Sequence, residues 1–139
     1  MTPGTLHHIG FVVADIRAAM PGFASSLAGD WDGRIWEDPI QQVKVAFLHL
    51  GSNRSQIELV EPASPSAPVL RFLNEKGGGL HHLCYEVEDM EGGLREMRSR
   101  GALLVRPPKP AVAFSGRRIA WLLTAEKLLI ELLERAPEL

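Results

Sequence analysis

The sequence predicts an α+β protein in which one small unit occurs twice. The segment Leu6–Val13 (LHHIGFVV) recurs 74 residues later as Leu80–Val87 (LHHLCYEV). The apolar run Ser55–Glu61 recurs as Leu128–Glu134, with the Ile-Glu-Leu core displaced by 73 residues. Similarity at a nearly constant offset indicates an internal duplication. Because each copy also reads as strand, helix and three strands, we expect two tandem βαβββ modules.

The first module begins with an alternating segment rich in β-branched and aromatic residues, residues 5–13, which predicts a strand. Asp15 is a suitable N-cap for a helix over residues 16–27, whose apolar residues recur with helical spacing. Pro21 predicts a kink or a break in this helix. Three further strands are predicted over residues 34–37, 43–50 and 56–61.

A segment rich in proline and glycine, residues 63–79, separates the modules and contains a possible short helix over residues 69–76. We therefore expect a single domain, residues 1–139, made of module one (1–62), this linker and module two (80–139). In module two, Gly101 is placed to end a helix over residues 89–100. The other elements expected there are strands over 80–87, 103–105, 117–123 and 128–134, and a loop at 107–110.

Composition places the chain among ordinary soluble proteins. It has 139 residues, of which 45% are hydrophobic and 23% are charged, and a formal net charge of −2. This charge gives no reason to expect nucleic acid or an anionic membrane as a partner. The sequence shows no long apolar segment and no signal peptide, so we expect no membrane anchor. Cys84 is the only cysteine, which fits a reducing, cytoplasmic location.

Strand alternation places one histidine and one glutamate of each module on the same kind of face. In the first strand of each module, the larger apolar side chains share one parity, which leaves His8 and His82 on the opposite face. In the last strand of each module, Glu58 and Glu131 lie between core-facing aliphatic residues. A buried carboxylate is costly unless it is paired or bound to a metal. We therefore expect all four residues to be metal ligands.

This set of ligands restricts the metal. Two imidazoles and two carboxylates suit one divalent ion such as Co²⁺, Ni²⁺, Zn²⁺, Mn²⁺ or Fe²⁺. One cysteine cannot provide the thiolate set of a structural zinc site. Such an ion polarises a carbonyl oxygen and stabilises developing negative charge. The residues expected to line the substrate cavity share the parity of the ligands or sit beside them: Val45, Phe47, Cys84, Ile119 and Trp121.

These residues resemble the vicinal oxygen chelate superfamily, which includes glyoxalase I, methylmalonyl-CoA epimerases, extradiol dioxygenases, and bleomycin and fosfomycin resistance proteins. The resemblance covers nearly the whole chain. Within the superfamily, the sequence is most similar to the methylmalonyl-CoA epimerases. This similarity is carried by His8-Ile9-Gly10, Leu59-Val60-Glu61-Pro62 and Gly78-Gly79-Leu80-His81-His82.

The resemblance implies an open, metal-holding β-barrel with ligands on the first and fourth strands of each module. It also implies a metal-dependent isomerase that moves the α-proton of an acyl thioester through a metal-stabilised enolate. Glu131 is then the expected catalytic base. The partner would be a small molecule of the acyl-CoA or glutathione thioester class, and the chain would form a homodimer. Lys44, Arg117 and Arg118 are considered for CoA phosphates, although surface charge is the simpler interpretation.

Two departures from the epimerase pattern leave alternatives open. The resemblance implies a catalytic glutamate on the third strand, where this chain has Val45 and its counterpart Ile119. Glu86 and Glu37 are then the remaining candidates for a second acid/base group. Glu58 matches bacterial glyoxalase I, so one alternative is a lactoylglutathione lyase-like isomerase. The other is a non-catalytic small-molecule-binding or resistance protein. An extradiol dioxygenase is disfavoured because Glu58 would fill a coordination position that oxygen chemistry needs open.

Overall fold

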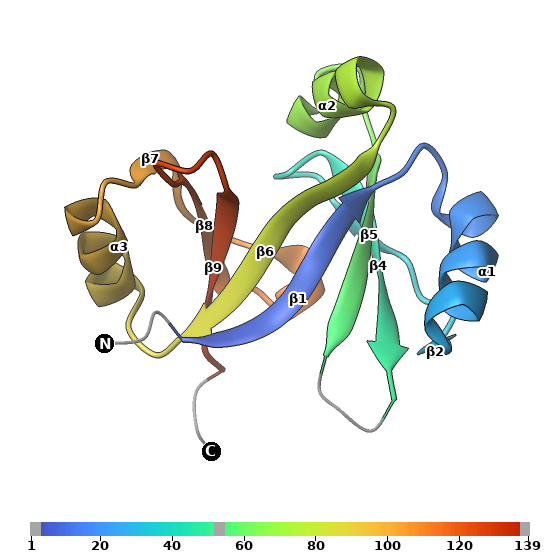
Figure 1. The fold of residues 1–139 in the computed structure, drawn as a ribbon, viewed down its shortest axis with the longest axis horizontal. Helices are drawn as coiled ribbons and strands as arrows, with labels where there is room; N and C mark the ends of the chain where they lie inside the picture. The colour runs from blue at the N-terminus through green and yellow to red at the C-terminus, as the bar shows by residue number, and fades with distance from the viewer. Residues whose placement is uncertain (1–3, 52–54, 137–139) are drawn as a thin grey trace. The chain divides into compact units, whose positions relative to one another are not determined.

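The computed structural model describes residues 4–51 and 55–136, and the chain divides into two compact units. The first unit is His8–His81. The second combines the segment before His8 with the chain from His82 onward. Each unit contains both helices and strands, which confirms the predicted α+β class (Figure 1). The boundaries predicted at residues 62 and 79, and the single domain, stay predictions.

The first unit is a sheet with the strand order β2-β4-β5-β1, and β3 also pairs with β4. β1 and β5 run parallel, whereas β4 is antiparallel to its three neighbours. Its elements are β1 (Thr5–Val12), α1 (Ile16–Leu27), β2 (Gly29–Trp31), β3 (Trp36–Asp38), β4 (Val43–Leu50), β5 (Gln56–Pro62) and α2 (Pro68–Lys76).

The second unit repeats this arrangement with the order β6-β9-β8-β7. Here β6 and β9 run parallel, and β8 is antiparallel to β9 and β7. In both units, therefore, the first and last strands of the repeat lie side by side. The elements are β6 (Gly79–Val87), α3 (Met90–Ser99), β7 (Leu103–Pro110), the short 3₁₀ helix η1 (Val112–Phe114), β8 (Arg118–Leu123) and β9 (Leu129–Glu134).

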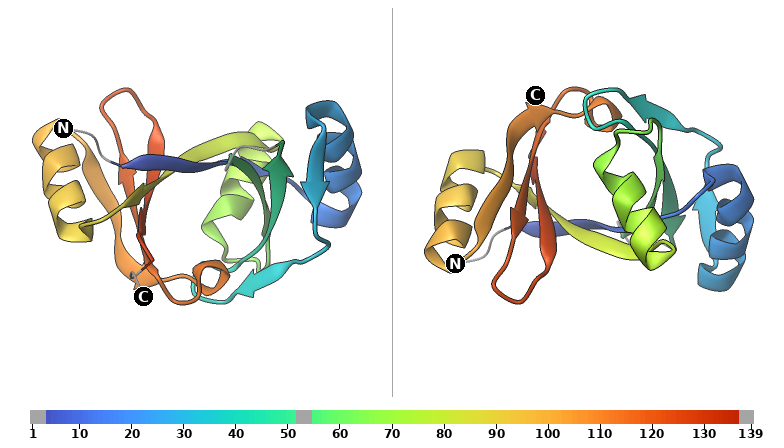
Figure 2. Two further views of the ribbon diagram at one scale, coloured as in Figure 1. Left: turned by 90° about the horizontal axis from the view of Figure 1, so that it is seen from below. Right: turned by 90° about the horizontal axis from the view of Figure 1, so that it is seen from above.

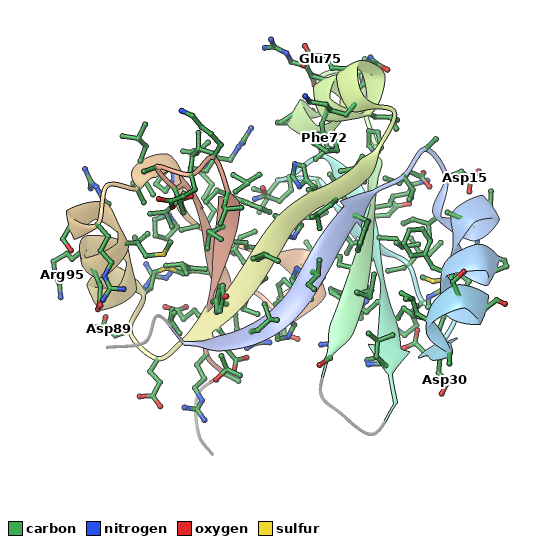
Figure 3. The ribbon with its side chains drawn as sticks, viewed as in Figure 1. Asp15, Asp30, Phe72, Glu75, Asp89 and Arg95 are labelled. Carbon is green, nitrogen blue, oxygen red and sulfur yellow. The ribbon has the colours of Figure 1, made fainter. Side chains whose placement is uncertain are left out.

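Both long helices begin after an aspartate, which confirms the predicted N-cap Asp15 and adds Asp89 as a second cap. The Asp15 carboxylate accepts a hydrogen bond from the Ala18 backbone N–H, and Asp89 accepts one from Gly92, each at 3.1 Å. Figure 3 shows both aspartates at the start of their helices. Gly101 follows α3 with φ +96°, a conformation that glycine adopts without strain, which confirms the predicted helix end.

The helix α1 continues through Pro21, so the break considered from the sequence does not occur. Proline removes one backbone hydrogen bond from a helix, a loss of roughly 3 kcal/mol in an isolated helix interior. Ile16 and Met20 of α1 are fully buried against the sheet, and this packing offsets the loss.

In each unit the helix lies along one face of the sheet (Figure 2), and an apolar core lies between them. In the first unit, Ile16 and Met20 pack with Ala46, Leu48, Ile57 and Leu59. In the second, Met90 packs with Val87, Ala102, Ala120, Leu122, Ile130 and Leu132. The helix occupies one face of each sheet, so polar side chains of the alternating strands project from the other face.

Two predicted segments differ from the structure. The strand expected at 34–37 is β3, two residues further on at its start, and β2 was not expected at all. The loop expected at 107–110 is part of β7. Proline is tolerated there because β7 is the edge strand of its sheet, where missing N–H donors break no ladder bond.

Within the described ranges, no helix combines the length and the apolar character needed to cross a membrane.

Candidate metal centre

The first unit holds one histidine–glutamate pair. His8 Nε2 lies 3.3 Å from Glu58 Oε1. The parallel register of β1 and β5 aligns Gly10 with Glu58, which places His8 two residues away on the same face. Both side chains are buried, at no more than 6% exposure. The fold therefore keeps this imidazole and this carboxylate together, away from water.

The second unit holds an equivalent pair with nearly the same geometry. His82 Nε2 lies 3.4 Å from Glu131 Oε1, and both side chains are buried. Cys84 is aligned with Glu131 on the parallel strands β6 and β9, in the position that Gly10 holds relative to Glu58. The sequence duplication has thus produced two matching pairs.

The atoms of each pair have the spacing of neighbouring metal ligands. Nitrogen and oxygen ligands lie about 2.1 Å from a divalent ion, so two of them are about 3.0 Å apart at a right angle and about 3.4 Å apart at the tetrahedral angle. The observed 3.3 and 3.4 Å fall in or close to this range and exceed the usual N–H···O distance of about 2.9 Å. Residues of these types, buried at this spacing, fit a metal ion.

An aromatic ring packs edge-on against each imidazole. Phe47 contacts His8 with ring centroids 5.7 Å apart, and Trp121 contacts His82 at 4.8 Å. Register aligns Phe47 with Glu58 and Trp121 with Glu131, so each ring shares the face of its pair. These ring contacts restrict rotation of the imidazoles.

The other predicted cavity residues follow the same strand parity. Val45 and Ile119 lie two residues from the aromatic rings on β4 and β8, and Cys84 lies opposite Glu131. All three are buried. Substrate contact by Val45, Phe47, Cys84, Ile119 and Trp121 stays a prediction.

The structure gives the remaining acid/base candidates a partner or a position on the other face. Glu86 shares the face of Glu131, but the Arg117 guanidinium binds its carboxylate at 3.0 Å. Glu37 is aligned with Lys44, on the face opposite to Trp36 and Val45. The second base considered from the sequence stays a prediction.

The cations considered for phosphate binding are engaged with carboxylates. Lys44 lies 3.9 Å from Glu61, and Arg118 binds both Glu134 and Glu91. The hydrogen bonds from Arg118 lower the pKa of Glu134 below its ordinary value. Lys44 and Arg118 lie on the helix side of their sheets, because their strand parity is opposite to that of Phe47 and Trp121.

Sequence reasoning missed two cations on the face of Glu131. Arg106 is aligned with Trp121, and Lys109 with Ile119, along β7. The Pro107-Pro108 pair predicts a loop, which hides their parity. A sequence feature that could have revealed them is that Arg106 and Lys109 flank a pair of prolines, which an edge strand can accommodate.

The two repeated sheets, each with a buried histidine–glutamate pair, define a glyoxalase-like fold with a candidate metal site. Residues 7–121 match the family model described as the Glyoxalase/Bleomycin resistance protein/Dioxygenase superfamily. The chain belongs to this family, as its sequence predicts.

Similar proteins include several epimerases. An ethylmalonyl-CoA/methylmalonyl-CoA epimerase of Cereibacter sphaeroides is 30% identical over 120 residues, covering 86% of this chain and 87% of that protein. The crystal structure of methylmalonyl-CoA epimerase from Mycobacterium tuberculosis has a TM-score of 0.83 at 29% identity, covering 96% of this chain and 89% of that one. A Streptomyces coelicolor methylmalonyl-CoA epimerase in complex with 2-nitronate-propionyl-CoA has a TM-score of 0.81 at 22% identity, which shows the shared fold.

Proposed function

We propose that the chain is an enzyme of the methylmalonyl-CoA epimerase type, which moves the α-proton of an acyl-CoA thioester. The observation that carries this proposal is the matched pair of buried histidine–glutamate contacts, 3.3 and 3.4 Å, in a chain similar to known epimerases. Support for an acyl-CoA substrate comes from relatives that carry epimerase names and from one solved with an acyl-CoA analogue.

We infer that His8, Glu58, His82 and Glu131 together bind one divalent ion, such as Co²⁺, Ni²⁺, Zn²⁺, Mn²⁺ or Fe²⁺. With neutral imidazoles, the two carboxylates carry two negative charges, which one divalent cation neutralises. When bound, such an ion supplies Lewis-acid stabilisation of negative charge on the thioester oxygen.

In this proposal the chain itself provides one proton carrier. Glu131 takes the α-proton, and the buried aromatic and aliphatic residues around it exclude water from the reacting carbon. Inversion of configuration also needs a proton donor on the opposite face of that carbon. Glu86 is bound by Arg117, and the strand positions of Val45 and Ile119 are apolar. We therefore expect proton exchange to outpace inversion.

The first test is deuterium uptake at the α-carbon of methylmalonyl-CoA in D₂O. Metal-free protein, protein reconstituted with Co²⁺ or Ni²⁺, and the Glu131→Ala variant are compared, with Glu126→Gln as a control. Glu126 is exposed in the turn before β9. We expect exchange only in metal-loaded wild type and in the control. Absence of exchange from protein that binds stoichiometric metal would contradict the epimerase proposal.

If no exchange occurs, the two alternative functions left open by the sequence become the leading candidates. A glyoxalase I-like lyase would convert the thiohemiacetal of glutathione and methylglyoxal, which a direct assay detects. A binding or resistance protein would turn over neither compound. The specific feature that favours the lyase is Glu58, which resembles the ligand of bacterial glyoxalase I.

We also infer a cytoplasmic homodimer. A chain of this size has a limited core in each unit, and association adds buried surface. The single cysteine fits a reducing compartment. Light scattering after size-exclusion chromatography measures the assembly, and a monomeric mass across micromolar concentrations would contradict the dimer.

A further inference from the structure

Two cations of the edge strand β7 lie on the face of the second unit that carries Glu131. Arg106 is aligned with Trp121, which is in turn aligned with Glu131. Lys109 is aligned with Ile119, two residues from Trp121 on the same face. Both cationic side chains belong to exposed residues. The sheet register therefore places them in line with the proposed reacting centre.

These cations differ from the other basic residues near β8 in having no internal counter-charge. Among residues 4–51 and 55–136, no carboxylate pairs with Arg106 or Lys109, whereas Arg117 binds Glu86 and Arg118 binds Glu134. Unpaired cations keep their full capacity to bind an external oxyanion, and arginine does so with two parallel hydrogen bonds. Arg106 and Lys109 are thus available to a ligand.

The backbone between the two cations is restrained. Pro107 and Pro108 each fix φ near −65°, and the register of β7 against β8 shifts on both sides of Arg106. Such restraint lowers the entropy that binding has to overcome. The backbone positions of Arg106 and Lys109 are therefore held at a defined spacing.

The distance from Glu131 suits a substrate-sized ligand. Neighbouring strands lie about 4.8 Å apart, so the backbone of Arg106, two strands away from β9, is about 10 Å from that of Glu131. An arginine side chain covers part of this distance. A thioester whose α-carbon lies at Glu131 would thus bring a nearby anionic group within reach of β7.

The corresponding face of the first unit carries mainly acidic residues. The strand register places Asp30 and Asp38 on the same face as Glu58, whereas Lys44 lies on the other side of the sheet. Arg34 is stacked on the Trp36 ring at 4.3 Å. Trp36 is aligned with Val45 on the Glu58 face. Because Arg34 is thus one cation beside three acidic residues, an anionic group is attracted more strongly to the second unit.

We propose that Arg106 and Lys109 form an anion subsite that holds an oxyanion of the thioester substrate. The oxyanion is either a phosphate of CoA or a carboxylate of the acyl group, which share this chemistry. The inference rests on the proposed function, since the substrate is taken to be an anionic acyl thioester.

The test compares substrates that separate the two anions. The Arg106→Gln/Lys109→Gln double variant and wild type, both metal-loaded, are assayed for α-deuterium exchange with methylmalonyl-CoA and with methylmalonyl-pantetheine, which lacks phosphate. CoA alone is titrated calorimetrically. Arg95→Gln is the matched control, because Arg95 is an exposed cation on α3, which covers the opposite face of the sheet (Figure 3). We expect KM for methylmalonyl-CoA to rise about tenfold in the double variant, with little change in kcat.

Each outcome decides a separate point. A KM increase confined to methylmalonyl-CoA, with weaker CoA binding, assigns the subsite to phosphate, and an increase with both substrates assigns it to the carboxylate. If KM and CoA affinity stay at wild-type values while exchange continues, the subsite is wrong and the proposed function stands. Easier aggregation with unchanged KM would show that the charges only protect the strand edge, which also overturns the subsite. A wild type that neither exchanges deuterium nor binds CoA contradicts both proposals.

Discussion

The two units share their histidine–glutamate pairs but differ in the charges around them. In the first unit, an aromatic ring, Phe47, lies against the pair, and the surrounding face carries mainly acidic residues. In the second, Trp121 replaces Phe47, Arg117 binds Glu86, and the edge strand adds Arg106 and Lys109. The pair geometry changes by 0.1 Å between the units.

This difference indicates which features the duplicated scaffold maintains. The parallel pairing of the first and last strands fixes the histidine and the glutamate, so both units keep them. Edge strands have neighbours on one side only and fewer constraints, so their side chains can diverge. We infer that the ligand pairs serve a common task and that the second unit provides substrate recognition and the base.

The largest effects are expected at the two glutamates, where substitution should weaken metal binding in both cases but abolish proton exchange in only one. Glu58→Gln and Glu131→Gln each remove one anionic ligand, so we expect metal affinity to fall at least about 100-fold in both. At saturating Co²⁺, only Glu131→Gln should lack α-deuterium exchange. Competition with a chromophoric chelator measures the affinity. An affinity loss in one variant alone would break the equivalence of the pairs.

The two cores should respond alike to truncation. Leu59 and Leu132 are fully buried in their respective units, so replacing either by alanine should lower the free energy of unfolding by about 2–5 kcal/mol. The exposed Leu103, at 67% exposure, is the control, with an expected change within about 0.5 kcal/mol. Urea titration followed by circular dichroism measures these changes. A loss below about 1 kcal/mol in one unit would show that its core relaxes to fill the space.

The helix N-caps provide a smaller, graded comparison. Asp89→Ala removes the acceptor for Gly92 N–H, which should cost about 1 kcal/mol. Asp15→Ala should cost less, because Glu61 still accepts a hydrogen bond of 2.8 Å from Ile16 N–H at the same helix end. Thermal and urea unfolding measure both variants, with Glu126→Ala as a surface control. Equal losses would mean that Glu61 adds nothing to the cap of α1.

The smallest effect concerns acid stability of the second unit. Arg118 lowers the pKa of Glu134 below 4.5, so this stabilisation is fully present above that value and is lost as pH falls through the lower, folded-state pKa. The pair is partly exposed, so its contribution should be small. Glu134→Gln should therefore flatten the acid side of the stability profile, measured by urea unfolding from pH 3 to 7. A profile parallel to wild type would contradict this contribution.

Much of the fold was predictable from the sequence because its signals are local. The period-2 alternation of residues 5–13 and 80–87 gives the strands and their parity, and the duplication gives the topology of both units. Gly101 and Asp89 act within a few residues of the helix that they bound. The errors fell where neighbours override local preference. Pro21 remains helical because its helix is packed on a sheet, and Pro107 and Pro108 belong to a strand because that strand is at an edge.

The sequence by itself determined the family, the repeated α+β unit and the four candidate ligands, since strand parity and internal similarity require no knowledge of distant contacts. The tertiary structure decided how the long charged side chains are used. It joined Glu86 to Arg117 and Arg118 to Glu134, and within the part of the chain that the structure describes it left Arg106 and Lys109 without counter-charges. The physical reason is that an ion pair depends on the register of neighbouring strands and on the reach of flexible side chains, and neither is encoded by spacing along one strand.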